Sequence, residues 1–151
     1  MKLIAHRGNI NGPNSEFENN PEYIDAALSK GFDVEIDVRY IEDQFYLGHD
    51  FAQYPISISW LEERKDNIWI HCKDLTSLKF FVNNLIDFNY FWHQEDDFTL
   101  TSQKYIWTYP GKSYTENSVL VMPELNTDID KMVEMKKYDC KGICSDYVGV
   151  L

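Results

Sequence analysis

The sequence predicts an α/β fold built on a largely parallel sheet. Apolar runs typical of strands take turns with segments whose apolar residues recur at helical spacing, and residues 32–40 alternate between apolar and mostly charged side chains. At 151 residues, 44% of them hydrophobic, the chain is long enough to bury a substantial core. We therefore expect a single domain, 1–151.

The first half of the chain contains the clearest elements. Residues 3–6 form a short apolar run that predicts a buried strand, and residues 9–20 are rich in Asn, Gly, Pro and Ser, which predicts a loop. Residues 21–30 are predicted to be helical because their apolar side chains share one face. After the strand at 32–40, residues 44–47 predict a short return strand.

The second half is predicted to contain more strands than helices. Residues 67–72 predict a strand, and an apolar stripe predicts a helix over 75–86. Further strands are expected at 90–92, 105–108, 119–122 and 142–144, and a further helix at 129–137. The seven strands other than 44–47 suggest a small β/α barrel. An open sheet fits the length better, since such barrels take about 250 residues.

The charge of the chain limits its partners. Acidic residues outnumber basic ones by 25 to 14, which gives a formal net charge of −11. Non-specific binding to nucleic acid or to an anionic membrane surface is therefore unfavourable. An anionic substrate would need a local positive site, supplied by Arg7, by a lysine or by a bound cation.

Targeting and redox features point to the cytoplasm. The apolar run at the N-terminus is too short for a signal peptide, and none approaches the ~18 residues of a membrane span. Cys72, Cys140 and Cys144 form no disulfide framework and suit reduced thiols. Cys140 and Cys144 have no second pair, so we expect no zinc site there.

Two carboxylates on the strand at 32–40 form the first candidate site. Glu35 and Asp37 are two residues apart, so they point to the same face. Side-by-side carboxylates repel each other, and a divalent cation with oxygen ligands relieves that repulsion. Alternation alone is equally typical of an edge strand with a solvated polar face, so both interpretations stay open.

All four histidines lie at or just past the C-terminal ends of predicted strands. They are His6, His49, His71 and His93. Ligand sites in parallel α/β folds form at that edge, so we expect the four to converge. His49 precedes Asp50, which either orients the imidazole or caps the next segment.

The residues after His6 suit phosphate binding. Arg7 offers a planar fork for phosphate oxygens, and Gly8 permits a tight turn with close approach of the backbone to a ligand. Four tryptophans are candidates either for a sugar or glycerol pocket or for the core, which we favour. They are Trp60, Trp69, Trp92 and Trp107.

The order of these motifs resembles the glycerophosphodiester phosphodiesterase family, within the phospholipase-C-like barrel enzymes. The motifs, which cover about the first third of the chain, are Ile4-Ala5-His6-Arg7-Gly8, Glu18-Asn19-Asn20-Pro21, Gly31-Phe32-Asp33-Val34-Glu35-Ile36-Asp37-Val38 and His49-Asp50. The resemblance implies a small, reduced TIM-type (β/α) barrel with few outer helices after strand 4.

The resemblance also assigns roles to residues of the site. By similarity, His6 and His49 form the acid–base pair, and Arg7 contacts phosphate. Glu35 and Asp37 bind magnesium or calcium. The resemblance also implies a possible role for Glu18, whose position lies near the metal in some members. His93 is a further possible site residue because it lies at the end of a predicted strand.

The third predicted strand departs from the family pattern. Where the family has Glu-x-Lys, this chain has His71-Cys72-Lys73. Lys73 keeps the position near phosphate, while His71 occupies that of a metal-binding glutamate. An imidazole is a softer ligand, so manganese or zinc becomes more plausible there.

The expected function is metal-dependent hydrolysis of glycerophosphodiesters or a related small-molecule phosphodiester. One alternative is a non-catalytic phosphoester- or sugar-phosphate-binding module on the same scaffold. Another is an enzyme with the same metal site but a different phosphorylated substrate, such as a cell-surface polysaccharide linkage. No nucleic-acid partner is expected.

Overall fold

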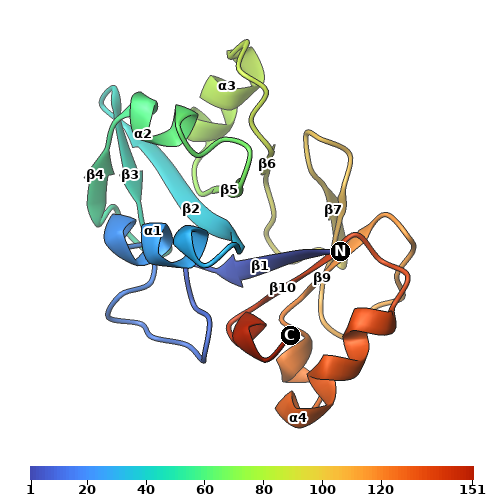
Figure 1. The fold of residues 1–151 in the computed structure, drawn as a ribbon. Coiled ribbons are helices and arrows are strands. Elements are labelled where there is room, and N and C mark those ends of the chain that lie inside the picture. Colours follow the sequence, from blue (N-terminus) through green and yellow to red (C-terminus); the bar gives the residue numbers. More distant parts are fainter.

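The computed structural model describes residues 1–151 and shows a curled sheet of ten strands with few helices (Figure 1). Seven strands are mutually parallel. In the order in which they pair, they are β6 (Tyr90–Phe91), β5 (Ile68–Cys72), β2 (Asp33–Ile41), β1 (Lys2–His6), β10 (Gly142–Ser145), β9 (Ser118–Val121) and β8 (Ile106–Thr108). All seven were predicted to within a few residues.

Three antiparallel strands extend this sheet. β3 (Gln44–Leu47) pairs with the end of β2, β4 (Tyr54–Ile56) pairs with β3, and β7 (Phe98–Leu100) pairs with β8. β3 was predicted with its observed bounds. β4 and β7 were not predicted, because three residues carry too little periodicity to distinguish a strand from a loop.

The sheet curls but does not close into a barrel. No ladder joins β6 to β8. The gap is bridged instead by a hydrogen bond from Ser102 N to Tyr90 O (2.8 Å) and by the rings of Phe91 and Trp107, whose centroids are 4.7 Å apart. The predicted mixed α/β class is confirmed, whereas a complete TIM barrel is not formed.

The helices are short and lie mainly beside the first half of the sheet (Figure 1). They are α1 (Pro21–Ser29), α2 (Ile58–Glu62), α3 (Leu75–Asn83) and α4 (Ile129–Met132), with 3₁₀ turns η1 (Pro123–Leu125), η2 (Val133–Lys137) and η3 (Val148–Val150). The helix expected over 129–137 is thus α-helical only in its first turn. No helix in the structure has both the length and the apolar character to cross a bilayer.

β2 lies in the middle of the sheet, paired with β1 on one side and β5 on the other. Its apolar residues Val34, Ile36 and Val38 are fully buried in the outer core that packs against the helices. Glu35 and Asp37 point to the opposite, inner face and are only 2% and 0% exposed. The edge-strand interpretation of this segment is therefore wrong.

The concave face of the sheet holds a second, smaller core. Its members are Ile4, Trp69, Phe91, Trp107, Val119, Val121 and Cys144. Among the tryptophans, Trp69 and Trp107 belong to this core, while Trp92 is 39% exposed and Trp60 packs against the Arg64 guanidinium. Trp60 is also partly buried against the outer core, so the preferred interpretation of the tryptophans as core residues holds fully for two of the four and in part for Trp60.

Candidate metal and acid–base site

The site lies where the inner core ends, at the carboxyl edge of the parallel strands. Side chains two residues apart on a strand share a face. Three inner-core residues are each followed, two positions later, by a polar side chain of the site: Ile4 by His6, Trp69 by His71 and Cys144 by Asp146. Apolar side chains therefore fill the interior of the curled sheet, and polar ones lie at its carboxyl edge, where parallel α/β sheets bind ligands.

One cavity collects the four histidines. It has a volume of about 270 Å³. Its wall includes His6, His49, His71 and His93, together with Arg7, Glu35, Trp107 and Tyr109. Residues from four separate predicted strand ends are therefore brought together, as their positions in the sequence indicate.

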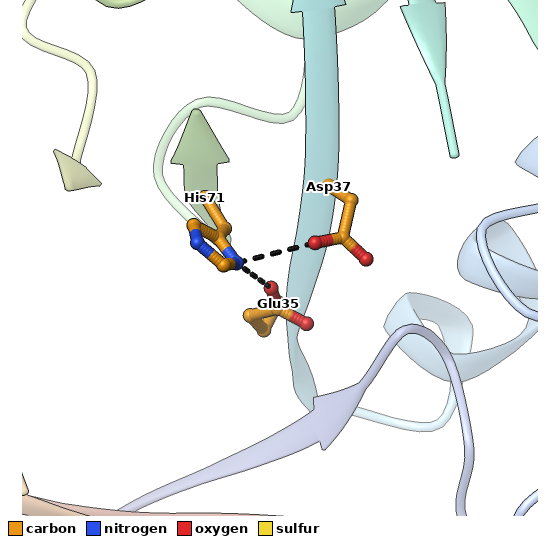
Figure 2. A group of neighbouring side chains, drawn as sticks. All are labelled: Glu35, Asp37 and His71. Atoms are coloured by element: carbon orange, nitrogen blue, oxygen red, sulfur yellow. Dashed lines mark ion pairs between the residues drawn. The ribbon is translucent and has the colours of Figure 1, made fainter. Parts of the chain in front are cut away.

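Glu35, Asp37 and His71 form a compact group with the chemistry of a metal site (Figure 2). His71 Nδ1 lies 3.2 Å from Asp37 Oδ1 and 3.7 Å from Glu35 Oε1. One ligand atom from each residue lies within 4.8 Å of the others. Glu35 Oε2 and Asp37 Oδ1 are buried without a hydrogen-bond partner. Buried oxygens without donors are costly, so the donor set fits a divalent cation.

The position of His71 suits a metal ligand. Its ring stacks on Phe91, with centroids 5.1 Å apart, and its Nε2 lies 3.4 Å from the carbonyl oxygen of His93. An N–H on Nε2 donated to that carbonyl leaves the Nδ1 lone pair directed at the two carboxylates. That arrangement calls for a positive charge between them, either a metal ion or a proton on Nδ1.

The two carboxylates of the group differ in their need for a cation. Burial raises the pKa of Glu35, and the adjacent charge of Asp37 raises it further. For Asp37, burial acts in the same direction, but the His71 contact and the Arg7 and Lys73 charges outweigh it and lower its pKa. The negative charge of Asp37 is therefore balanced by neighbouring protein groups, whereas that of Glu35 is not.

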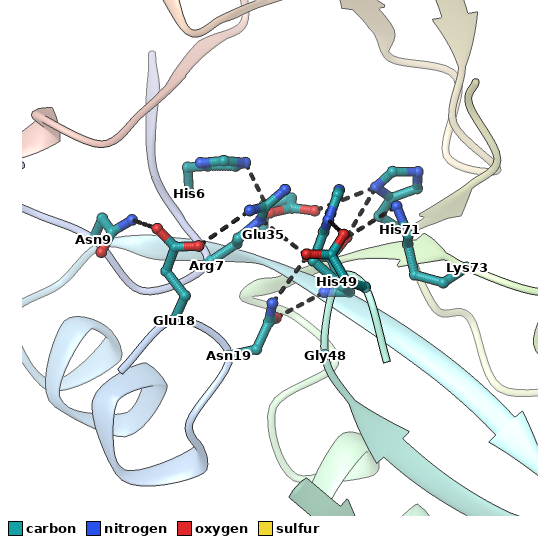
Figure 3. Close-up of polar contacts among 12 residues, drawn as sticks. His6, Arg7, Asn9, Glu18, Asn19, Glu35, Gly48, His49, His71 and Lys73 are labelled. Atoms are coloured by element: carbon teal, nitrogen blue, oxygen red, sulfur yellow. Dashed lines mark hydrogen bonds and ion pairs between the residues drawn. The ribbon is translucent and has the colours of Figure 1, made fainter. Parts of the chain in front are cut away.

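Arg7 bridges two carboxylates beside the cavity (Figure 3). Its Nη1 donates to Glu18 Oε2 at 3.1 Å, and its Nε lies 3.0 Å from Asp37 Oδ2, while Nη2 has no hydrogen bond within the protein. Glu18 thus contacts Arg7 and is not part of the Glu35–Asp37–His71 group. Lys73 Nζ lies 3.7 Å from Asp37 Oδ1 and does not line the cavity.

Two asparagines from the predicted loop complete the site and were missed as site residues. Asn19 is buried, donates Nδ2 to Asp37 Oδ2 and accepts the Asp37 backbone N–H, both at 2.9 Å. Its φ of 62° is one that asparagine tolerates well. Asn9 donates to Glu18 Oε1 at 3.0 Å and to Asp146 Oδ1 at 2.8 Å. Loop composition alone does not distinguish such residues from solvated ones.

Each of two histidines is oriented by an aspartate. His6 Nδ1 lies 2.8 Å from Asp146 Oδ1, and His49 Nδ1 lies 2.7 Å from Asp50 Oδ1. When Nδ1 carries the donated proton, Nε2 is free to exchange protons. Burial disfavours protonation of His6, but its bond to Asp146 and the charge of Glu35 outweigh this and raise its pKa. Of the two roles considered for Asp50, the structure shows the orienting one, since Asp50 bonds to His49 and Ser57 caps the following helix α2.

The turn that carries His49 is held by Arg39. Arg39 Nε donates to Gly48 O at 3.1 Å, and its Nη2 donates to the carbonyl of His49. Gly48 has a φ of 145°, and a Cβ there would lie 2.1 Å from Phe51 O. This position therefore requires glycine, and the turn fixes where the His49 ring lies.

His93 lies on the far wall of the cavity. Its ring stacks on Tyr109 with centroids 3.8 Å apart, and its Nδ1 is buried without a hydrogen bond. Burial and the charges of His71 and Lys73 lower the pKa of His93 to about 4. His93 is therefore uncharged near neutral pH. Its backbone carbonyl, rather than its ring, contacts His71 Nε2.

Gly8 has a different role from the one expected. Its φ is +91°, and a Cβ there would lie 2.8 Å from Cδ1 of Tyr23. The close approach is thus to a ring of α1 rather than to a ligand, and it fixes the turn between Arg7 and Asn9.

We predict that Gly8→Ala lowers the free energy of unfolding by about 2–4 kcal/mol, combining a left-handed φ with a clash. Gly31→Ala is the matched control: its φ is +89°, but nothing lies within 4 Å of a new Cβ. Its cost should be about 1 kcal/mol. Urea unfolding measures both, and equal losses would show that the Tyr23 contact is unimportant.

The site therefore combines two oriented imidazoles, the Glu35–Asp37–His71 group, whose donor atoms fit a cation, and two basic side chains. Such a set can move protons beside a bound anion and neutralise its charge.

In comparisons with known proteins, no family model, no curated protein and no solved structure matched the chain.

Proposed function

We propose that this protein is a metal-dependent phosphodiester hydrolase resembling the glycerophosphodiester phosphodiesterases, on a small, reduced TIM-type scaffold. The observation that carries the proposal is the convergence of His6, His49 and His71 with Glu35 on one cavity. Acid–base groups and a cation-binding group within one cavity match what the in-line cleavage of a phosphodiester requires.

Glu35, Asp37 and His71 would hold the divalent cation. Two carboxylates suit magnesium or calcium, and the imidazole of His71 extends the choice to manganese or zinc. When bound, the cation would neutralise the phosphate and stabilise the alkoxide that develops on the leaving oxygen. The protein's own contribution is to hold these ligands rigidly, through Asn19 and the carbonyl of His93.

The remaining groups bind phosphate and move protons. Arg7 would direct its free Nη2 at a non-bridging oxygen, with Lys73 as a second cation nearby. One of His6 and His49 would take the proton of the nucleophile, a water or a neighbouring substrate hydroxyl. The other would protonate the leaving oxygen. The apolar side of the cavity, including Trp107 and Val121, would limit access of water.

A panel assay tests this function. Chelator-treated protein would be supplied with magnesium, calcium, manganese or zinc and then with bis-p-nitrophenyl phosphate or glycerophosphodiesters. We expect turnover with at least one metal and none with chelator. No turnover with any metal, together with tight binding of inorganic phosphate, would favour the non-catalytic binding module.

We predict that Asp146→Asn lowers kcat about 10- to 100-fold and shifts the pH–rate profile, because Asp146 orients His6. KM should change much less, since Asp146 does not line the cavity. Steady-state kinetics across pH measure both effects. Asp50→Asn provides the comparison at the exposed pair, where a smaller effect is expected. An unchanged pH profile in Asp146→Asn would show that the buried pair is only structural.

A further inference from the structure

A second cavity lies beside the proposed catalytic one. It has a volume of about 160 Å³ and sits at the carboxyl ends of β8 and β9, next to η2. Tyr109, Pro110 and Val121 line both cavities. The two cavities are therefore adjacent, and one of the shared residues, Tyr109, stacks on His93 of the first cavity.

The chemistry of this second cavity is unlike that of the first. None of its lining side chains is acidic, although the chain contains 25 acidic residues. Its one basic residue, Lys112, is paired with Asp97 at 2.7 Å. Because this pair is balanced, the cavity offers no net charge to attract either an anion or a cation.

Aromatic and amide groups dominate the lining instead. Tyr114 and Tyr138 stack with an interplanar angle of 6° and centroids 5.6 Å apart, which provides one flat wall. The Asn126 side chain makes no hydrogen bond within the protein. A Cβ at Gly111 would lie 3.3 Å from its Nδ2, so glycine leaves room for that amide. Flat aromatic surface with a few free polar groups is typical of a site for a neutral, partly polar ligand.

We propose that the second cavity binds a neutral sugar ring esterified to the phosphate held in the first. The proposal rests on the function proposed above and deepens it by naming the substrate class. The volume suits one ring rather than a large ligand. The apolar face of the sugar would pack against the tyrosine wall, and its hydroxyl groups would bond to Asn126 and Thr127.

Two esters with the same leaving group test this inference. Both are p-nitrophenyl phosphodiesters: one carries methyl glucoside through its primary hydroxyl, and the other carries glycerol. We expect the wild-type protein to favour the glucoside at least about tenfold in kcat/KM, which corresponds to about 1.4 kcal/mol. Tyr138→Leu and Asn126→Ala should each reduce that preference several-fold, mainly by raising KM for the glucoside.

Tyr46→Leu is the matched control, since Tyr46 lies on β3 and lines neither cavity. It should keep the wild-type preference. Circular dichroism would check the fold of each variant. Turnover of both esters without a preference, or with one that Tyr138→Leu and Asn126→Ala both leave intact, overturns this inference alone. Turnover of neither ester overturns the proposed function, and this inference with it.

Discussion

His6→Ala and His49→Ala will each lower kcat/KM for phosphodiester hydrolysis by about 10²- to 10⁴-fold, the range expected for loss of a general acid or base. Both histidines line the catalytic cavity, and both have Nδ1 held by an aspartate, so Nε2 is the atom that exchanges protons. The measurement is p-nitrophenolate release from bis-p-nitrophenyl phosphate at saturating metal.

The matched comparison for these variants is His93→Ala. His93 lines the same cavity, but the low pKa of its side chain removes it from proton transfer near neutral pH. We expect a smaller loss of rate, because the change removes only the imidazole stacked on Tyr109 and keeps the backbone carbonyl that contacts His71. Full rates in both His6→Ala and His49→Ala would show that the assigned roles are wrong, and a loss confined to His93→Ala would reverse the assignment.

Asp37→Asn will strongly destabilise the metal-free protein, whereas Glu35→Gln will not. Asp37 is fully buried and contacts the partly buried cations Arg7 and Lys73, so its neutralisation removes the buried partner of both and should cost about 3–5 kcal/mol. Glu35 is buried beside Asp37 and keeps an oxygen without a donor. Removing its charge should be neutral or stabilising by roughly 1 kcal/mol or more.

Urea unfolding with a chelator, and again with excess manganese, measures this contrast. Manganese at about 100 times its Kd should add about 2.7 kcal/mol to the wild-type protein. It should add little to Glu35→Gln or Asp37→Asn. A chelator-treated Glu35→Gln variant that is as unstable as Asp37→Asn would mean that Glu35 is fully satisfied without a cation.

The seven parallel strands, β3 and the inner face of the sheet were predictable because their signals are local. The alternation over 32–40 specifies both that the segment is a strand and that Glu35 and Asp37 share a face. It does not specify which neighbours pair with that strand. Only the pairing of β2 with β1 and β5 decides that the carboxylates are buried rather than solvated.

The polar residues that orient the site were less predictable. Asn9 and Asn19 lie in a segment whose composition is typical of any loop, and their partners Asp146 and Asp37 are distant in sequence. Asp146 itself follows the last strand, β10, in the same way that the histidines follow theirs. Applying the strand-end rule to aspartates as well as histidines would have identified it.

The helices show the same division. α1 was predicted closely because its apolar face is continuous, and the structure adds a side-chain cap from Asn20. The segment 129–137 has a helical pattern and buries Met132 and Met135, but it changes to 3₁₀ geometry after Met132. α2 has only five residues, and its cap Ser57 is a signal too short to separate from a turn.

The dependence of hydrolysis on manganese, in the wild-type protein, Glu35→Gln and Asp33→Asn, tests the central claim most directly. Asp33 lies on the same strand and the same face as Glu35, two residues nearer the start of β2, where it bonds to Lys2, Asn67 and Trp69. We predict that the chelator abolishes turnover. Added manganese should restore turnover of the wild-type protein and of Asp33→Asn with a similar dependence on its concentration. Glu35→Gln should need at least about tenfold more metal. Turnover that persists in chelator, or identical manganese curves for Glu35→Gln and the wild-type protein, would contradict the account.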